Sequence, residues 1–464
     1  MRTRRIVFLL IAALLAFGVG LAYFWGQPRV VQVEPAGGAA EVPAGAALRI
    51  SFNRPMEAQS VSSRLTIDPA QTGEVSWEGN TLVFTPGQPW PSGQTVQARL
   101  APGSRAAGLL PLTVSQETSW SFTIGHPRLL YLSPSDGPAN LYLIDPLSGE
   151  SRQLTQGLGA VLDYSANLTG TSIFFNTSLG NGGSAIYHLD RLSGEAQMLL
   201  DCPDALCRYS QISPNGETLA YERTGVLSAS QANTPQVWLL PLSPSSTPQA
   251  TGSPSLAGAP DQRTQQPHWS PSGLLTYYNF SLSAFIVQDA QGRLVAQFLS
   301  QTGIPGSWDP RGEHYIIPEI YTNDIADPNL TDLETLPSSR LLEYSLDGSQ
   351  RDLTGSDDVE DSSPAHAPNG ETLAFARKFL DIQRWTPGRQ LWQMKPDGSQ
   401  AAALTQEPYY NHYDLVWSPD SAQLAYVRFN KDSLLEPPEV WLIDAAGSDA
   451  RRLVSGGYSP QWIP

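Results

Sequence analysis

Residues 212–221 read Ile-Ser-Pro-Asn-Gly-Glu-Thr-Leu-Ala-Tyr, and this stretch decides the fold because it recurs along the chain. An apolar residue ends one strand, Ser-Pro-Asn-Gly forms a tight turn, and the alternating residues that follow return as an antiparallel strand. The stretch therefore predicts a β-hairpin. Further copies of its turn begin beside Trp269, Trp308, His366 and Trp417, and a degenerate copy covers residues 165–175.

Each copy of the hairpin continues into two more strands. A variable loop leads to a third strand such as residues 390–394, Lys395-Pro396-Asp397-Gly398 turns the chain again, and a fourth strand closes near Leu404. Four antiparallel strands per copy, with copies about 40 to 58 residues apart, are typical of one blade of a β-propeller. The repeats predict about seven blades.

The end of the chain carries a further inner-strand motif, Tyr458-Ser459-Pro460-Gln461-Trp462, whereas the first blade, within residues 128–155, lacks an opening strand. We expect the C-terminal strand to complete the first blade, because this closes the ring and removes an open sheet edge. The sequence thus predicts an all-β seven-bladed propeller closed by its C-terminal strand.

Residues 27–125 predict a separate β-domain. Apolar and polar residues alternate at 48–52, 81–84, 95–100 and 120–124, with Pro and Gly between these runs. About seven short strands fit this length, which favours an Ig-like β-sandwich.

The first 26 residues have the pattern of a membrane anchor. Arg2, Arg4 and Arg5 precede an uninterrupted apolar run, residues 6–25, which is long enough to cross a bilayer as a helix. Positive charge on the N-terminal side predicts a cytoplasmic N-terminus and an extracytoplasmic remainder. A cleaved signal peptide is the alternative, although bulky residues 23–25 stand where a peptidase needs small ones. The predicted domains are 1–26, a cytoplasmic stub and transmembrane signal anchor; 27–125, the sandwich; and 126–464, the propeller.

Two segments resemble known families. Residues 34–36, 42–43, 50–56 and 81–86 resemble the SbsA-type bacterial Ig-like domain, which implies a spacer or adhesion module of envelope and surface-layer proteins. The repeats of residues 128–464 resemble TolB-type propeller repeats, also called WD40-like or PD40 repeats. This second resemblance implies a periplasmic or surface role: members bind envelope proteins, serve as substrate gates on peptidases or occasionally act as lyases.

The composition and motifs argue against several activities. Lys and Arg number 28 against 44 Asp and Glu, and the net charge of −16 repels nucleic-acid phosphates. A serine-peptidase function is disfavoured because Gly-x-Ser-x-Gly does not occur in the sequence. We expect a chain that is not an enzyme and that needs no cofactor.

Histidines supply the one metal hypothesis. His268, His366 and His412 lie on or beside inner strands, and the resemblance implies a possible inner histidine set, as in TolB-like oligosaccharide lyases. Packing is the alternative, because His366 occupies the position of Trp269 and Trp417 in sister repeats. Separately, the only two cysteines, Cys202 and Cys207, flank one short loop of a segment expected outside the cell, and this predicts a disulfide.

The predicted binding face carries the long loops. Connections from strand two to three, and from each blade to the next, emerge opposite the short Ser-Pro-Asn-Gly turns and vary in length. An acidic and a tyrosine-rich segment on this face could bind cations, sugars or peptide side chains. The candidate binding residues are Asp357, Asp358, Glu360, Asp361, Tyr409, Tyr410, His412 and Tyr413.

These expectations combine into a function. The sequence predicts a single-pass plasma-membrane protein that binds an envelope protein, peptide or glycan through the long-loop face of its propeller. The alternatives are a polysaccharide-active lyase or hydrolase with an inner histidine metal site, and a structural component of a surface layer.

Overall fold

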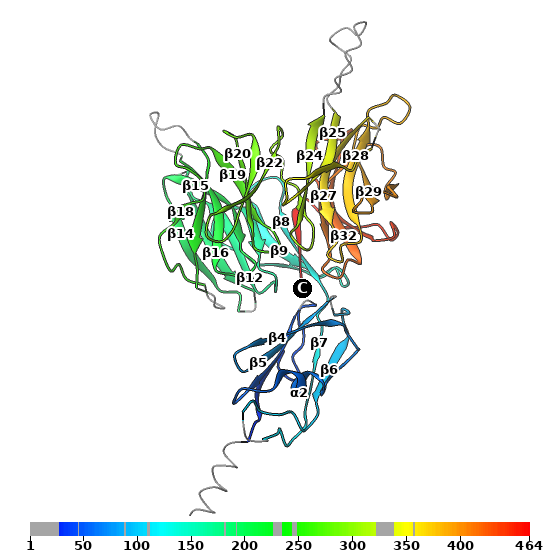
Figure 1. Cartoon of the computed structure of the whole chain (residues 1–464). Helices are drawn as coiled ribbons and strands as arrows, with labels where there is room; N and C mark the ends of the chain where they lie inside the picture. Colours follow the sequence, from blue (N-terminus) through cyan, green and yellow to red (C-terminus); the bar gives the residue numbers. More distant parts are fainter. Residues whose placement is uncertain are drawn as a thin grey trace, which may run out of the picture. The chain divides into compact units, whose positions relative to one another are not determined.

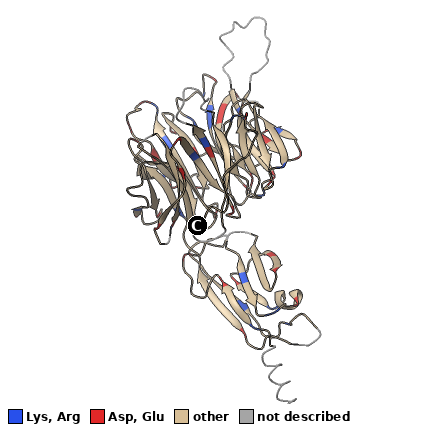
Figure 2. Cartoon of the chain, turned by 90° about the vertical axis from the view of Figure 1, so that its left-hand side faces the viewer, with Lys and Arg blue, Asp and Glu red and all other residues tan. Residues whose placement is uncertain are grey.

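The computed structural model describes residues 27–44, 46–87, 90–108, 112–180, 182–191, 193–225, 234–243, 248–321, 338–355 and 358–464. The chain divides into two compact units, residues 1–126 and 127–464 (Figure 1). Basic and acidic residues are interspersed with uncharged ones in both units (Figure 2). No helix of the described residues is long and apolar enough to cross a membrane, and the predicted anchor lies outside them.

The first unit is built from two antiparallel sheets around one core. Trp90 is fully buried between them, lies against Phe84 and Phe122, and donates its indole N–H to the carbonyl oxygen of Ala46 at 2.8 Å. One sheet has the order β1 (Val30–Glu34), β2 (Leu48–Phe52), β5 (Thr81–Pro86), β4 (Gly73–Glu78); the other has the order β3 (Leu65–Asp68), β6 (Thr95–Leu100), β7 (Thr118–Thr123); and α2 (Ala58–Ser62) precedes β3.

The second unit consists of antiparallel groups of four strands, which we call blades 1 to 7. In blade 1 the C-terminal strand is innermost and pairs with the strand that begins at Arg128, as the repeat predicts. Blade 1 contains β35 (Tyr458–Ile463), β8 (Arg128–Ser133), β9 (Asn140–Ile144) and β10 (Ser151–Gln153); blade 2 contains β11 (Val161–Ala166), β12 (Ser172–Ser178), β13 (Ser184–Asp190) and β14 (Ala196–Cys202); blade 3 contains β15 (Ala205–Ile212), β16 (Thr218–Gly225), β17 (Gln236–Pro241) and β18 (Ser255–Leu256).

The remaining blades repeat this order. Blades 5 and 6 are also joined by one parallel strand pair, Ser339 with Glu360. Blade 4 contains β19 (Thr264–Trp269), β20 (Leu275–Asn279), β21 (Ala284–Gln288) and β22 (Leu294–Leu299); blade 5 contains β23 (Ser307–Trp308), β24 (His314–Tyr321), β25 (Ser338–Ser345) and β26 (Gln350–Asp352); blade 6 contains β27 (Val359–His366), β28 (Leu373–Phe379), β29 (Gln390–Met394) and β30 (Ala402–Ala403); blade 7 contains β31 (Tyr410–Trp417), β32 (Gln423–Asn430), β33 (Glu439–Asp444) and β34 (Arg451–Ser455).

Hydrophobic packing joins the blades into a propeller-like ring. Each blade shares a buried cluster with the next, and blade 7 shares one with blade 1, where Val427 and Val440 lie in the same cluster as Leu129 and Trp462. Each cluster buries apolar side chains from both neighbouring sheets, so no blade packs alone.

The repeated tetrapeptides form the expected turns between the first two strands of a blade. In blade 3 the Gly216 N–H donates to the Ser213 carbonyl oxygen at 2.8 Å, and Gly216 adopts a positive φ of 75°. The same bond recurs at Gly273, Gly312 and Gly370. These turns are short and alike from blade to blade. The connections that vary in length lie at the opposite ends of the strands.

Candidate functional site

Three loops of blades 6 and 7 are joined by backbone hydrogen bonds on the side opposite the short turns. The Gly388 N–H donates to the Pro408 carbonyl oxygen at 2.9 Å, and the Lys431 N–H donates to the Tyr409 carbonyl oxygen at 2.8 Å. These bonds link the β28–β29, β30–β31 and β32–β33 connections. We call residues 380–389, 404–409 and 431–438 the three-loop surface.

The three-loop surface exposes large apolar side chains. Such residues are normally scattered singly on a protein surface, whereas here five of them share three linked loops. Their exposed fractions are 96% for Ile382, 52% for Trp385, 51% for Tyr409, 75% for Leu434 and 99% for Leu435.

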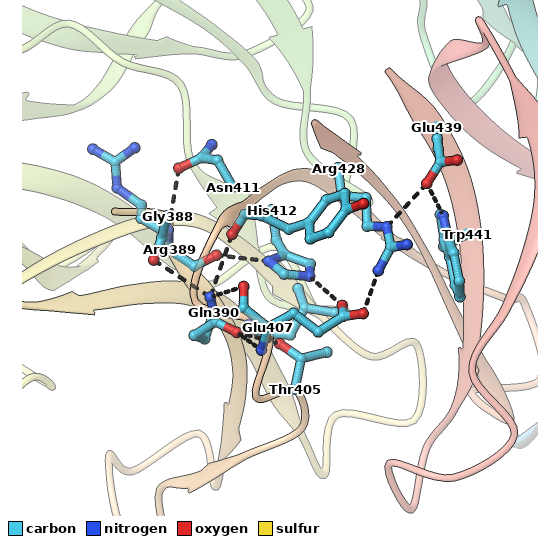
Figure 3. Close-up of polar contacts among 12 residues, drawn as sticks. Gly388, Arg389, Gln390, Thr405, Glu407, Asn411, His412, Arg428, Glu439 and Trp441 are labelled. Carbon is cyan, nitrogen blue, oxygen red and sulfur yellow. Dashed lines mark hydrogen bonds and ion pairs between the residues drawn. The ribbon is translucent and has the colours of Figure 1, made fainter. Parts of the chain in front are cut away.

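A network of charged side chains around the buried Arg428 contacts these loops (Figure 3). The Arg428 guanidinium lies between the rings of Tyr410 and Trp441, with its Cζ 4.0 Å and 3.6 Å from the two ring centroids. It donates to Glu407 Oε1 at 2.5 Å and to Glu439 Oε2 at 3.1 Å. Glu407 belongs to the β30–β31 connection, so this network holds that loop against blade 7.

His412 completes the network on its inner side. Its Nδ1 lies 2.7 Å from the Arg389 carbonyl oxygen, and because a carbonyl can only accept, Nδ1 carries a proton. Its Nε2 lies 3.4 Å from Glu407 Oε2. The His412 imidazole and the Arg428 guanidinium together lower the pKa of Glu407 to about 2, so this carboxylate stays ionised down to strongly acidic pH.

The tyrosine-rich segment is mostly strand and not loop. β31 begins at Tyr410, so His412 is fully buried and Tyr413 packs edge-on against Phe429, with ring centroids 5.8 Å apart. Only Tyr409 of the predicted aromatic set is exposed on the three-loop surface. The loop is shorter than expected because Tyr410 already pairs with Asn430 of β32, and the residues that follow continue this pairing.

The acidic segment is also largely strand. β27 begins at Val359, and Asp361 is fully buried, where it pairs with Arg377 through two bonds of 2.7 Å. Glu360 forms an ion pair of 3.0 Å with Arg389. Asp358 lies just before the strand, and Asp357 lies outside the described residues.

Arg389 connects the two predicted segments. Its guanidinium binds Glu360 in blade 6, while its carbonyl oxygen faces His412 in blade 7. The sequence predicted long loops on this side of the blades but did not single out Ile382, Trp385, Leu434 and Leu435. Their apolar character within long loops was the available signal.

The three candidate metal-binding histidines have separate surroundings. His268 stacks on Tyr315 with ring centroids 5.2 Å apart, and burial lowers its pKa to about 4. His366 Nδ1 lies 3.3 Å from Ser307 Oγ of the preceding blade. Within the described residues, no group of three or more His, Cys, Asp or Glu side chains is placed to hold a metal ion.

The position of His366 matches that of tryptophans in sister blades. Trp269 Nε1 donates to the Gln211 carbonyl oxygen of the preceding blade at 3.0 Å, and Trp417 Nε1 donates to that of Ala365 at 3.0 Å. His366 contacts Ser307 of the preceding blade through the serine hydroxyl, to which its backbone N–H donates at 3.1 Å, and this contact supports the packing interpretation of this histidine.

Cys202 and Cys207 form a disulfide with an S–S distance of 2.05 Å. Both cysteines are buried in the cluster between blades 2 and 3. The disulfide thus closes the turn between the outermost strand of blade 2 and the innermost strand of blade 3.

A cavity of about 570 Å³ lies where the inner strands converge. Six chain segments line it, and five of these are the inner strands β11, β15, β27, β31 and β35. Non-glycine residues with φ near +50° occur at the same repeat position in β15, β27, β31 and β35, namely at Tyr209, Ser363, Asp414 and Ser459. Each of these residues lines the cavity.

Comparisons with known proteins agree with this architecture. Residues 26–124 match the family model of the bacterial Ig-like domain. A puromycin-hydrolysing peptidase from Mycobacterium tuberculosis is 14% identical with a TM-score of 0.51, and the match covers 90% of this chain and 57% of the peptidase. This likeness shows the fold alone.

Two further solved structures are similar at lower scores. TolB from Acinetobacter baumannii is 11% identical with a TM-score of 0.41, covering 94% of this chain and 99% of TolB. The β-propeller domain of the trilobed protease from Pyrococcus furiosus is 12% identical with a TM-score of 0.46, covering 63% of this chain and 84% of that domain. No curated protein matches the sequence.

Proposed function

We propose that this chain is a membrane-anchored, non-enzymatic binding protein of the cell envelope, in which an Ig-like unit acts as a spacer for a seven-bladed β-propeller closed by its C-terminal strand. The observation that carries the proposal is the three-loop surface. Exposed aliphatic and aromatic side chains on loops tied to a rigid scaffold are suited to burial against a partner.

The chemistry of this surface favours a protein or peptide over a glycan. Ile382, Leu434 and Leu435 offer no hydrogen-bonding atoms in their side chains, whereas sugar hydroxyl groups need donors and acceptors when they lose water. Trp385 and Tyr409 are residue types that often dominate binding energy at protein interfaces. The partner would therefore present apolar side chains to the three loops.

Site-specific photo-crosslinking tests the binding surface. A benzophenone amino acid replaces Leu435 in the full-length chain, and irradiated envelopes are analysed for crosslinked species. We expect one defined protein or peptide adduct, which weakens at least fivefold when Ile382 and Leu434 are both changed to Ser. The control places the same probe at Asn215, an exposed residue of a short turn on the opposite side. An equal adduct at Asn215, or none at Leu435, would refute the proposal.

Fractionation tests the anchor separately. Deletion of residues 2–25 removes the apolar run that the proposal places in the bilayer. The full chain is expected in the membrane pellet after a high-salt wash, and the shortened chain in the soluble fraction. Recovery of both chains in the same fraction would contradict membrane anchoring without bearing on the three-loop surface.

A further inference from the structure

One series of polar contacts joins all three connections of the three-loop surface. It begins at the Arg389 carbonyl oxygen, at the end of the β28–β29 connection, to which His412 Nδ1 donates at 2.7 Å. His412 Nε2 lies 3.4 Å from Oε2 of Glu407 in the β30–β31 connection, and Oε1 of Glu407 accepts from Arg428 at 2.5 Å. Arg428 donates in turn to Glu439, which directly follows the β32–β33 connection (Figure 3). His412 is thus the link between the first connection and the second.

Both ring nitrogens of His412 face oxygen atoms that can only accept hydrogen bonds. A carbonyl oxygen and an ionised carboxylate have no proton to donate, whereas a neutral imidazole carries a proton on one nitrogen only. Glu407 is ionised, since Arg428 forms an ion pair with it and the pKa of its carboxyl group, lowered by His412 and Arg428, is about 2. A neutral His412 ring would therefore turn a lone pair toward an acceptor oxygen.

Turning the ring does not remove this conflict. Rotation by 180° exchanges ring nitrogens and carbons, so that C–H groups would face the Arg389 carbonyl oxygen and the Glu407 carboxylate. His412 is fully buried, and in the described part of the chain its Nε2 has no conventional hydrogen-bond partner, so the carboxylate at 3.4 Å is an ion-pair contact. An imidazolium removes the conflict, because each nitrogen then carries a proton.

The surroundings of His412 can balance a buried positive charge. A buried charge is unfavourable unless it is paired, and here the two cations His412 and Arg428 meet the two carboxylates Glu407 and Glu439. The charged and titratable groups around the ring are Glu407, Arg428 directly opposite on β32, Tyr426 with its ring centroid 5.4 Å away, Tyr410 of β31 stacked on Arg428, and, one contact further, Glu439 with Arg452 and Arg389 with Glu360.

We propose that His412 is an imidazolium in the folded chain and that its proton holds the three connections of the three-loop surface in one arrangement. Loss of this proton as the pH rises turns the Nε2 lone pair toward the Glu407 carboxylate, and the repulsion acts on the loop that carries Tyr409. The protonated ring stabilises the held arrangement, so partner binding is stronger at low pH and weakens as the pH rises. This pH dependence rests on the proposed function, whereas the protonation of His412 does not.

Nuclear magnetic resonance tests the protonation without any partner. The full-length chain is labelled with ¹⁵N-histidine in detergent, and His412→Gln assigns the signals of His412. At pH 7 we expect both ring nitrogens of His412 to show the chemical shift of protonated nitrogen. Glu407→Gln removes the carboxylate, should return Nε2 to the unprotonated shift, and assigns the ring if His412→Gln fails to fold. One unprotonated nitrogen at pH 7 in the unaltered chain would overturn the proposal.

Photo-crosslinking from the probe at Leu435 tests the regulation, with the adduct yield compared at pH 6 and pH 9. We expect at least threefold more adduct at pH 6 for the unaltered chain and a ratio near one for His412→Gln, or for Glu407→Gln if the first variant fails to fold. His188→Gln changes a buried histidine of blade 2 and should keep the full ratio.

The outcomes separate the regulation from the proposed function. A ratio near one in the unaltered chain, or the same ratio with and without His412, would overturn the regulation and leave the binding surface in place. Absence of the adduct at both pH values would contradict the proposed function and the regulation with it, and the nitrogen shifts alone then decide the protonation of His412.

Discussion

The indole N–H of Trp417 in blade 7 donates a 3.0 Å hydrogen bond to the carbonyl oxygen of Ala365 in blade 6. The same contact joins Trp269 to Gln211 and Trp462 to Val416, in each case from one inner strand to that of the neighbouring blade. Because these bonds recur at one repeat position, they set the register of adjacent blades as well as filling the space between them.

Replacement of Trp417 by Phe tests this contact. The ring remains apolar, but the Ala365 carbonyl oxygen loses its donor in a buried position, which costs about 1–3 kcal/mol. We expect the urea midpoint, followed by far-UV circular dichroism, to fall accordingly. Trp385→Phe removes an exposed indole and is the matched control, with an expected change within about 0.5 kcal/mol. Equal midpoints for the two variants would show that the inter-blade bond contributes little.

Asp361→Ala is expected to lower the free energy of unfolding much more than the position of Asp361 in a run of acidic residues suggests. Asp361 and Arg377 are both buried, and removal of the carboxylate leaves the guanidinium without its partner, at a cost of about 3–5 kcal/mol. Asp204→Ala breaks the exposed pair with Arg223 and is expected to cost no more than about 1 kcal/mol. Denaturant unfolding of both variants compares the two, and a similar small loss in each would contradict a structural role for Asp361.

The repeat architecture could be predicted from sequence because its signals are local. Turn residues such as Ser213 and Gly216 stand next to the strands they connect, and alternation marks the strands themselves. The completion of blade 1 by β35 also followed from the sequence, since a leftover inner-strand motif at the end matched a missing one at the start.

The binding residues were harder to predict because their surroundings are not local. Asp361 belongs to a run of acidic residues, and nothing adjacent shows that Arg377, in the next strand, neutralises it. Pro408 and the tyrosines after it suggested a loop, but pairing with β32 makes most of that segment strand. Leu434 and Leu435 lie in the β32–β33 connection. The alternation of polar and apolar residues describes strands, so it does not predict whether residues of a connection are exposed.

His366 gives the propeller a predictable sensitivity to acid. Burial lowers its pKa from 6.5 to about 4, so the folded state favours the neutral imidazole. The stability that this histidine supports is present above pH 6.5 and is lost as the pH falls toward 4. We expect His366→Gln to remove about 1–2 kcal/mol of the difference in unfolding free energy between pH 7.5 and pH 5. An unchanged difference would show that His366 does not titrate in this window.

Asp414 is expected to show the opposite pH dependence. Burial raises its pKa from 3.8 to about 6, so the folded state favours the protonated acid, and the ionised form weakens the fold above pH 6. Asp414→Asn should therefore raise the free energy of unfolding at pH 8 by on the order of 1 kcal/mol, a value discounted because water in the cavity screens the charge. At pH 4 this gain in the free energy of unfolding should nearly vanish, because Asp414 is then protonated to a large extent in both the folded and the unfolded state.

Thermal unfolding of Asp414→Asn and of the unaltered chain at both pH values measures this difference. Asp163 titrates in both proteins, so its contribution to the difference cancels. A variant that is less stable than the unaltered chain at pH 8 would mean that the ionised carboxylate supports the fold.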